Sequence, residues 1–300
     1  MDRLALKYAK IAKEPSTIAS YEKSFSNFTH FVNNVLGLHV NLPVSSENIG
    51  RYITFMFENG YKVSYIRSSL SGIGYFHKIK CLEDPADCYF ITDLLKGLEK
   101  LRPSGDSRLP IQKPLLVKLL RGIEMCANSP YQKLLFSAMC LLAYYALLRV
   151  GEVTKSNSVI KNVIRVDQVS LTKSSMIVVF ENFKFSRGKT HSLRIKRVVA
   201  SPCPVDYLSR YLLVRPKVKG PLFCKIDGSY VSRDQFVTVL KKSLNCLNVD
   251  STHFNSHSFR IGRCTDLSQE GYSESQIKLI GRWNSSSYKK YVRPNIVNAG

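Results

Sequence analysis

Four side chains near the C-terminal end of this 300-residue chain combine a proton acceptor, a fixed positive charge, an indole and a phenol: His257, Arg260, Trp283 and Tyr291. His257 and Arg260 are three residues apart, so on a helix they share one face. A guanidinium is permanently charged and can donate two hydrogen bonds to an oxyanion. Breaking a phosphodiester requires a nucleophile, positive charge around the phosphorus and a proton for the leaving oxygen, and this set of residue types suits that chemistry.

Three short helices with clear start signals are expected to position these side chains. Ser256 can cap a helix over residues 257–271. A capping box opens a second helix over 273–281. The serine cluster 285–287 begins a third helix, which carries Tyr291.

The ordered pattern His-x-x-Arg, Gly-Arg-Trp and a tyrosine before Val-Arg resembles the C-terminal box of the tyrosine recombinase (phage integrase) family, over residues 255–294. Its wording is most similar to the Crypton and DIRS-like recombinases of eukaryotic mobile elements. The resemblance implies that Tyr291 is the nucleophile, that His257 supports proton transfer, and that Trp283 binds the phosphate or buttresses the tyrosine helix. It also implies a covalent 3′-phosphotyrosine, formed without ATP, metal or other cofactor. Tyr288 is expected to be a packing residue.

An arginine follows the strongly apolar helix expected over residues 130–148. Arg149 stands in an Arg-x-x-Glu setting with Glu152, and placing an arginine beside a buried helix is costly unless an anion meets it. An arginine favoured by the helix dipole is the alternative. The family resemblance implies that Arg149 and Arg260 are the two catalytic arginines. The chain departs from the family at Leu147, where glycine is usual.

A three-stranded antiparallel meander is predicted from three β-like runs, which cover 163–171, 176–183 and 191–199. The turn between the last two runs carries three cations: Lys184, Arg187 and Lys189. The resemblance implies that a lysine here protonates the leaving 5′-hydroxyl. Lys184 fits the end of the outgoing strand best, and Lys189 is its rival. A charged hairpin tip without a catalytic role is the alternative.

The charge balance points to a polyanionic partner. Lys and Arg total 44 against 22 Asp and Glu, which gives a net charge of +22 and a pI near 9.7. Nucleic acid is the usual partner of such a chain, while a solvated basic surface or an acidic protein partner would also fit. The eight cysteines include no Cys-x-x-Cys pair, so a structural zinc site is not expected. We expect no membrane span and no secretion signal, and a nuclear location if the host is eukaryotic.

Four short amphipathic helices are predicted in residues 1–102, after a mobile basic arm over 1–14. Their order resembles the core-binding (SAM-like) DNA-binding domain of the family. A stretch with proline and glycine, 103–112, is expected to be the linker to a catalytic domain over 113–300. Basic residues of the third helix, the hairpin and the C-terminal box are the expected DNA contacts: Lys62, Arg67, Lys78, Arg187, Lys189 and Arg282.

We therefore predict a mainly α protein with a small antiparallel β-sheet, in which an N-terminal helical core-binding bundle precedes a mixed α/β tyrosine-recombinase catalytic domain. The predicted function is a site-specific recombinase or integrase that acts on double-stranded DNA, as a homotetramer on two DNA sites, for integration or excision of a mobile element. The alternatives are an inactive DNA-binding protein derived from such a recombinase, a type IB topoisomerase-like enzyme, and a basic scaffold for an acidic partner.

Overall fold

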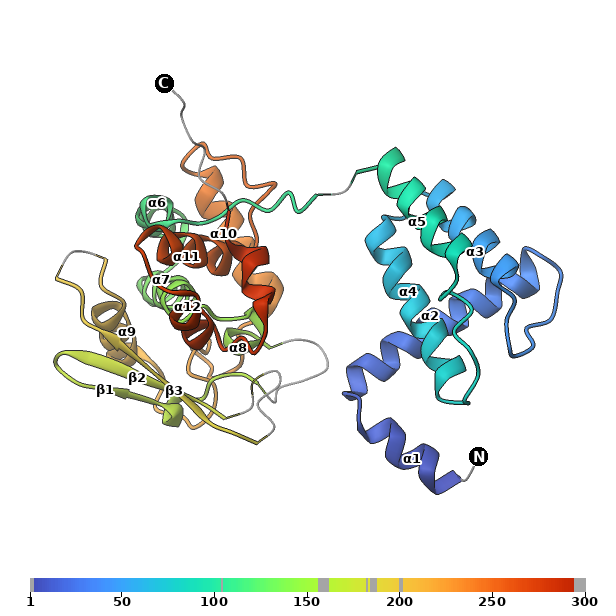
Figure 1. Cartoon of the computed structure of the whole chain (residues 1–300). Helices are drawn as coiled ribbons and strands as arrows, with labels where there is room; N and C mark the ends of the chain where they lie inside the picture. Colours follow the sequence, from blue (N-terminus) through green and yellow to red (C-terminus); the bar gives the residue numbers. More distant parts are fainter. Residues whose placement is uncertain are drawn as a thin grey trace. The chain divides into compact units, whose positions relative to one another are not determined.

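The structure, a computed structural model, describes residues 3–103, 105–155, 162–181, 183, 188–199 and 202–293. The chain divides into two compact units, Met1–Asp106 and Ser107–Gly300, and the boundary falls within the stretch expected to be the linker (Figure 1). Helices dominate both units and the second adds a small sheet, so the predicted fold class is confirmed. Within the described ranges, no helix is long and apolar enough to cross a membrane.

The N-terminal unit contains five described helices: α1 (Arg3–Ile11), α2 (Pro15–Asn34), α3 (Ser46–Glu58), α4 (Val63–Lys78) and α5 (Tyr89–Leu101). The four predicted helices are confirmed, but the expectation of an arm over 1–14 was wrong. That segment forms α1, because it has no glycine or proline before Pro15 and repeats its apolar residues at helical spacing.

The core of this unit is aliphatic and aromatic, with Phe28, Ile53 and Ile66 fully buried. His77 is also fully buried. Its Nε2 accepts a hydrogen bond from the Val44 N–H at 3.0 Å, and its Nδ1 lies 2.9 Å from the Ile73 carbonyl. A ring that accepts at one nitrogen and donates at the other is neutral, so His77 is a satisfied core histidine that fixes the chain before α3.

The second unit is built around α7 (Pro130–Tyr145), which is buried along most of its length. The other helices of the described part are α6 (Lys113–Cys126), α8 (Val150–Val153), α9 (Pro204–Val214), α10 (Arg233–Asn245), α11 (His257–Gln269) and α12 (Glu274–Gly281), with the short 3-10 helices η1 (Val166–Gln168) and η2 (Ser286–Tyr291). Helices α6, α9 and α11 all contact α7, so the central helix holds the unit together.

The predicted meander is confirmed as β1 (Val169–Leu171), β2 (Ser175–Phe180) and β3 (His191–Lys196), paired antiparallel in the order β1-β2-β3. The first strand begins at Val169 and not at residue 163. The reason is local: the Gln168 side chain accepts the Arg165 N–H at 2.8 Å, which stabilises the 3-10 turn of η1 in front of the strand.

Helix α7 ends three residues earlier than expected, because Leu147 has a φ of +49°. Glycine adopts this left-handed conformation readily, whereas it costs an ordinary residue about 1–2 kcal/mol. The Leu147 side chain is fully buried against Leu267, Ile277 and Tyr288. Burial of a leucine contributes roughly 1.5–3 kcal/mol, enough to offset the strained backbone.

Helix α11 is fixed to the start of the second unit through Asp266. Its carboxylate accepts hydrogen bonds from the Gln112 side chain at 2.8 Å and the Lys113 N–H at 2.9 Å, and from the Tyr144 hydroxyl. The Ile111 N–H donates to the Ser258 carbonyl at 2.9 Å. The first turns of α11, which carry His257 and Arg260, are therefore held in place from two sides.

This close approach predicts a large cost for a single methyl group. A Cβ at Gly262 would lie 1.9 Å from the Ile111 carbonyl oxygen. We expect Gly262→Ala to lower the free energy of unfolding of the second unit by about 2–3 kcal/mol. Urea unfolding followed by the fluorescence of Trp283, the single tryptophan, measures it. The matched control is Gly151→Ala, where a Cβ meets nothing within 4 Å. Equal stability of the two variants would contradict the prediction.

Candidate active site

The start of α11 presents His257 and Arg260 on one face, as the sequence predicts. The capping residue differs from the expectation: Ser256 has helical dihedral angles and its side chain caps nothing. Instead, the Asn255 side chain accepts the His257 N–H at 2.8 Å, and the Ser258 hydroxyl accepts the Asn255 N–H at 3.0 Å. Asparagine serves as well as serine in such a turn, so the helix still begins at His257.

Arg260 is fully buried and is held in one orientation. Its Nη1 donates to the Leu147 carbonyl and its Nη2 to the Gly281 carbonyl, the latter at 2.8 Å. The guanidinium carbon lies 3.9 Å from the centre of the Trp283 ring and 5.4 Å from that of Tyr291. Burial, followed by the charge of Arg149, lowers the pKa of Arg260 to about 9, so it stays a cation at neutral pH.

The donors of Arg260 are only partly used. A guanidinium has five N–H groups, and the Nε of Arg260 has no partner among the described residues although it is buried. A buried donor without a partner is costly. An oxygen that reached this N–H would satisfy it.

Tyr291, at the end of η2, completes the cluster around Arg260. Its ring centre lies 5.3 Å from that of Trp283 and 5.9 Å from that of His257. The backbone of this segment is tied to α11, because the Thr265 hydroxyl accepts the Arg293 N–H at 3.1 Å. The structure thus brings together the four C-terminal residues singled out by the sequence. Tyr288 is buried against the core of this region, which confirms its interpretation as a packing residue.

Arg149 stands at the start of α8, and 25% of its side chain is exposed. Glu152 is almost fully buried and accepts from the Arg149 N–H at 2.8 Å and from its Nη1 at 3.3 Å. The charge of Arg149 contributes to the lowered pKa of both Arg260 and His257. Arg260 donates to the Leu147 carbonyl, two residues before Arg149, so the two predicted arginines meet at the same turn of the chain.

Arg282 corrects one prediction. It was expected to contact DNA, but its side chain has no exposed surface and its Nη2 lies 2.9 Å from a carboxylate oxygen of Glu152. Burial also lowers its pKa. The sequence offered one overlooked signal: Glu152 follows a buried helix, and a buried carboxylate needs cationic partners. Nothing in the sequence said that the second partner would be Arg282.

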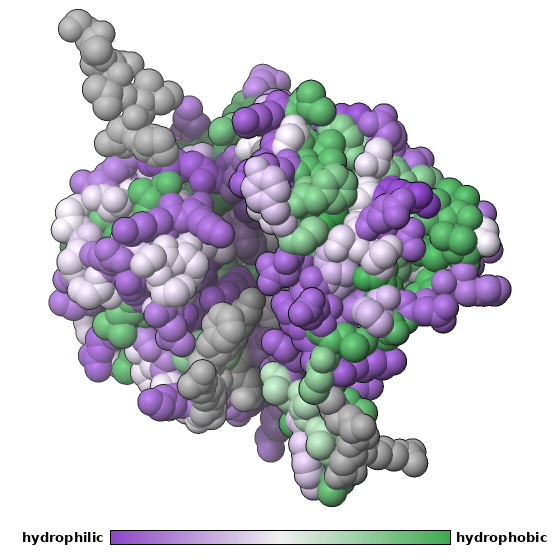
Figure 2. Space-filling model, turned by 45° about the vertical axis from the view of Figure 1, so that its right-hand side comes forward, coloured by the Kyte–Doolittle hydropathy of each residue, from purple (hydrophilic) through white to green (hydrophobic). Residues whose placement is uncertain are grey.

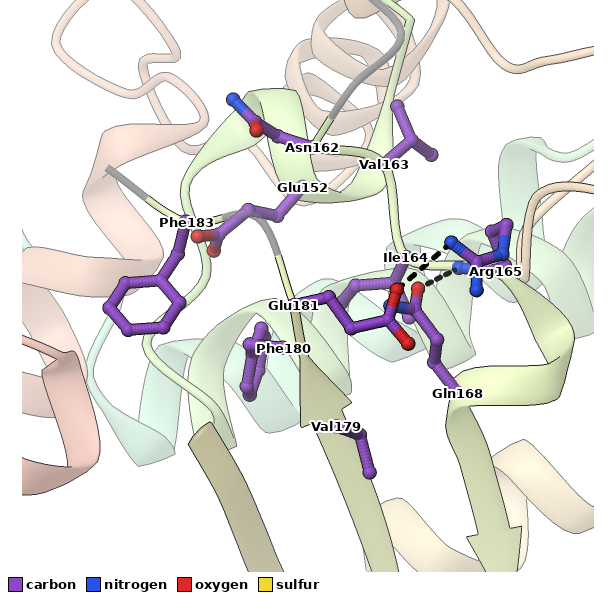
Figure 3. A pocket seen from close by; sticks show the side chains of 10 residues that line it. All are labelled: Glu152, Asn162, Val163, Ile164, Arg165, Gln168, Val179, Phe180, Glu181 and Phe183. Carbon is purple, nitrogen blue, oxygen red and sulfur yellow. Dashed lines mark hydrogen bonds and ion pairs between the residues drawn. The ribbon is translucent and has the colours of Figure 1, made fainter. Parts of the chain in front are cut away.

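Two residues of the predicted hairpin, Lys184 and Arg187, lie outside the described residues, and their roles stay predictions. Lys189 is described and exposed. The base of the hairpin lies beside the site: Phe180, the last residue of β2, has its ring 3.8 Å from the guanidinium carbon of Arg282. Figure 3 shows Glu152 across a small pocket from the end of this strand.

The three predicted DNA contacts of the N-terminal unit lie on or next to α4 and are exposed. Arg67 pairs with Glu99 at 2.9 Å and Lys78 with Asp84 at 2.9 Å, while Lys62 precedes the helix. The side of this unit that is visible in Figure 2 shows hydrophobic side chains scattered among hydrophilic ones. Their contact with DNA stays a prediction.

His257 gives the site an acid-sensitive group. Burial, followed by the charges of Arg108 and Arg260, lowers its pKa to about 4, against about 6.5 in an unfolded chain. The folded state therefore binds this proton less readily than the unfolded state. The stability that goes with neutral His257 is complete above about pH 6.5 and is lost as the pH falls towards 4.

We expect His257→Gln to be less sensitive to acid than the wild type. Its Tm should fall less between pH 7 and pH 4.5, by several degrees, because glutamine has no proton to gain. Differential scanning calorimetry at both pH values measures the difference. The control is His253→Gln, at an exposed position. Parallel acid sensitivity of wild type and His257→Gln would contradict the assignment.

The sequence model of the phage integrase family matches residues 120–296. No curated protein sequence matches the chain. No group of three or more His, Cys, Asp or Glu side chains in the described ranges is arranged to hold a metal ion.

Several solved structures share the fold. The chain is similar to the XerH site-specific recombinase bound to a palindromic difH substrate in a post-cleavage complex, with 13% identity and a TM-score of 0.64 over 94% of this chain and 76% of that one. It is similar to the Tn1549 transposon integrase in complex with a circular intermediate DNA, with 14% identity and a TM-score of 0.66 over 97% and 93%. It is also similar to a lambda integrase tetramer bound to a Holliday junction, with 10% identity and a TM-score of 0.65 over 95% of this chain and 74% of that one.

Proposed function

The chain belongs to the phage integrase family of tyrosine recombinases, and from this premise we propose that it cuts and rejoins double-stranded DNA at specific sites with Tyr291 as its nucleophile. The observation that carries the proposal is the convergence of Tyr291 with Arg260, His257 and Trp283 around one guanidinium. A phenol packed against a fixed cation and a neutral imidazole is suited to attack on an anionic phosphodiester.

In the proposed reaction the Tyr291 oxygen attacks the phosphorus, and the bond to the 5′ oxygen breaks. The phenolic proton passes to His257, whose ring is neutral at neutral pH and so has a nitrogen lone pair for it. Arg149 and Arg260 bind the non-bridging oxygens and stabilise the negative charge that develops there. The leaving 5′ oxygen takes a proton from a lysine of the hairpin and departs as a 5′-hydroxyl.

The product is a 3′-phosphotyrosine ester, which is the covalent intermediate. Because the ester retains the energy of the broken phosphodiester, a 5′-hydroxyl can attack it and reseal the strand without ATP. One subunit cuts one strand, so exchange between two duplexes requires four active sites. We propose a homotetramer on two DNA sites, and the lambda integrase tetramer on a Holliday junction supports that arrangement.

The net charge of +22 supports duplex DNA as the substrate, because contacts with phosphates dominate such binding. Integration or excision of a mobile element, with a nuclear location in a eukaryotic host, is the proposed setting. The Tn1549 transposon integrase, which has the same fold, supports the first part. The resemblance of the C-terminal box to Crypton and DIRS-like recombinases stays a prediction.

A covalent trap tests the proposed function. The protein is incubated with nicked duplexes that carry candidate element ends, in EDTA and without ATP, and the mixture is run on a denaturing gel. Release of the short fragment downstream of the nick prevents resealing, so an active enzyme accumulates as an adduct with DNA. Tight binding to the same duplexes without any adduct would favour the inactive DNA-binding alternative. Relaxation of supercoiled plasmids without strand exchange would favour the topoisomerase-like one.

A further inference from the structure

Arg282 occupies a position where an arginine is unexpected. It is the residue after α12, and its φ of +55° is the left-handed conformation that glycine or asparagine adopts most readily at the end of a helix. Its side chain is nevertheless long, charged and fully buried. The strained backbone and the loss of hydration both cost free energy. The Arg282 side chain must therefore make contacts that offset these costs and that a glycine could not make.

Those contacts join three separate parts of the active site. Nη2 lies 2.9 Å from the Glu152 carboxylate, which also binds Arg149. Nη1 donates to the Ala146 carbonyl at 3.2 Å, in the turn that follows α7. The guanidinium carbon lies 3.8 Å from the Phe180 ring, where β2 leads into the hairpin.

The neighbours of Arg282 in sequence belong to the site as well. The preceding residue, Gly281, gives its carbonyl to Arg260, and the following residue, Trp283, packs on the same guanidinium. A shift of Arg282 would therefore move these two partners of Arg260. The carboxylate of Glu152 would be displaced at the same time, and Arg149 with it.

We propose that Arg282 is a positioning residue for strand cleavage, which holds Arg149 through Glu152 and fixes the base of the hairpin through Phe180. This inference rests on the proposed function, since it assigns the geometry that the reaction needs. A second cation on Glu152 also shares the negative charge of that carboxylate. Arg149 then keeps more of its positive field for the phosphate, which a lone ion pair would neutralise.

The chain provides a matched control in Arg215. This arginine is also buried, with 7% of its surface exposed. Among the described residues, its side chain donates to backbone carbonyls of the adjacent loop, including those of Leu222 at 3.0 Å and Pro221 at 2.8 Å. Loss of Arg215 therefore reports the cost of removing a buried arginine that touches none of the site residues.

The experiment compares Arg282→Met, Arg282→Lys and Arg215→Met with the wild type. Single-turnover cleavage of the nicked duplex, DNA affinity and the folded fraction are measured for each protein. We expect Arg282→Met to cleave about 100-fold more slowly per folded molecule, with DNA affinity within about threefold of the wild type. Arg282→Lys keeps the charge but loses the fork, so about tenfold slower cleavage is expected. Arg215→Met should stay within about threefold in both.

A double variant shows whether the effect passes through Glu152. If it does, Arg282→Met should slow cleavage much less when Glu152 is already glutamine. Cleavage by Arg282→Met that matches Arg215→Met per folded molecule would overturn the proposal, as would full additivity with Glu152→Gln. Should Arg282→Met fail to fold, Arg282→Lys decides the question on the same criteria.

A second readout does not depend on cleavage. In the NMR spectrum of the wild type, the side-chain Nε–H resonance of Arg149 should be sharp, with a chemical shift that differs from that of exposed arginines. In Arg282→Lys the chemical shift should move towards the value of exposed arginines. In Arg215→Met it should stay unchanged. Absence of a covalent adduct in the wild type would count against the proposed function alone. An unchanged Arg149 signal in Arg282→Lys would count against the positioning role.

Discussion

Tyr291→Phe is expected to form no covalent adduct with DNA, a loss of cleavage of at least about 10⁴-fold, while its DNA affinity stays within about threefold of the wild type. Phenylalanine keeps the ring that packs against Trp283, His257 and the Arg260 guanidinium. It removes only the oxygen that attacks phosphorus. The site therefore keeps its shape and charge but has no nucleophile.

Tyr288→Phe is the matched control, since Tyr288 lies in the same 3-10 helix three residues earlier. Its ring is buried in the cluster with Leu147 and Leu267, away from the cations of the site. We expect this variant to form the adduct at a rate within about threefold of the wild type. Denaturing gels of both variants with the nicked duplex decide the matter. An adduct that persists in Tyr291→Phe and vanishes in Tyr288→Phe would show that Tyr288, and not Tyr291, is the nucleophile.

Much of the candidate site is local in sequence, and for that reason it could be predicted. His257 and Arg260 share a helix face because they are three residues apart, and the capping box at Ser273 starts the next helix as expected. Only the short segment between this helix and Tyr291 then has to be predicted. A 3-10 helix replaces the predicted last helix there, yet it still delivers the tyrosine to Arg260.

What could not be predicted depends on contacts between distant residues. The ion pair between Arg282 and Glu152 spans 130 positions of sequence, so the sequence around Arg282 carries no local sign of it. An arginine between two helical segments looks like a surface cation, and only tertiary packing decides that it is buried. The left-handed Leu147 is similar, because the leucine is tolerated only through its contacts with residues of α11, α12 and η2.

Arg149→Met is expected to slow cleavage by about 10³-fold or more, the range found when a charge-stabilising arginine is removed from a phosphoryl-transfer site. A quarter of the Arg149 side chain is exposed, whereas Arg260 is fully buried. Arg149 is therefore the guanidinium that an incoming phosphate can reach most directly. The fold should survive its loss, because Glu152 keeps its ion pair with Arg282.

The loss of this charge should also be visible in the titration of the site. Burial is the main cause of the lowered pKa of His257 and the charge of Arg149 is a minor one, so this pKa should rise only slightly in Arg149→Met. NMR titration of the histidine ring measures that shift without any cleavage.

Two variants complete this test. Arg149→Lys restores the charge but not the two-pronged donor, so it should recover part of the rate. Arg165→Met is the control, because Arg165 is an exposed arginine of the same unit whose side chain pairs with Asp167 and Glu181. Single-turnover rates on the nicked duplex give the comparison. If Arg149→Met cleaved as fast as Arg165→Met, the positive charge at the phosphorus would have to come from Arg260 and the hairpin alone. The buried position of Arg260, with two of its donors engaged by carbonyls, makes that outcome the less favourable one.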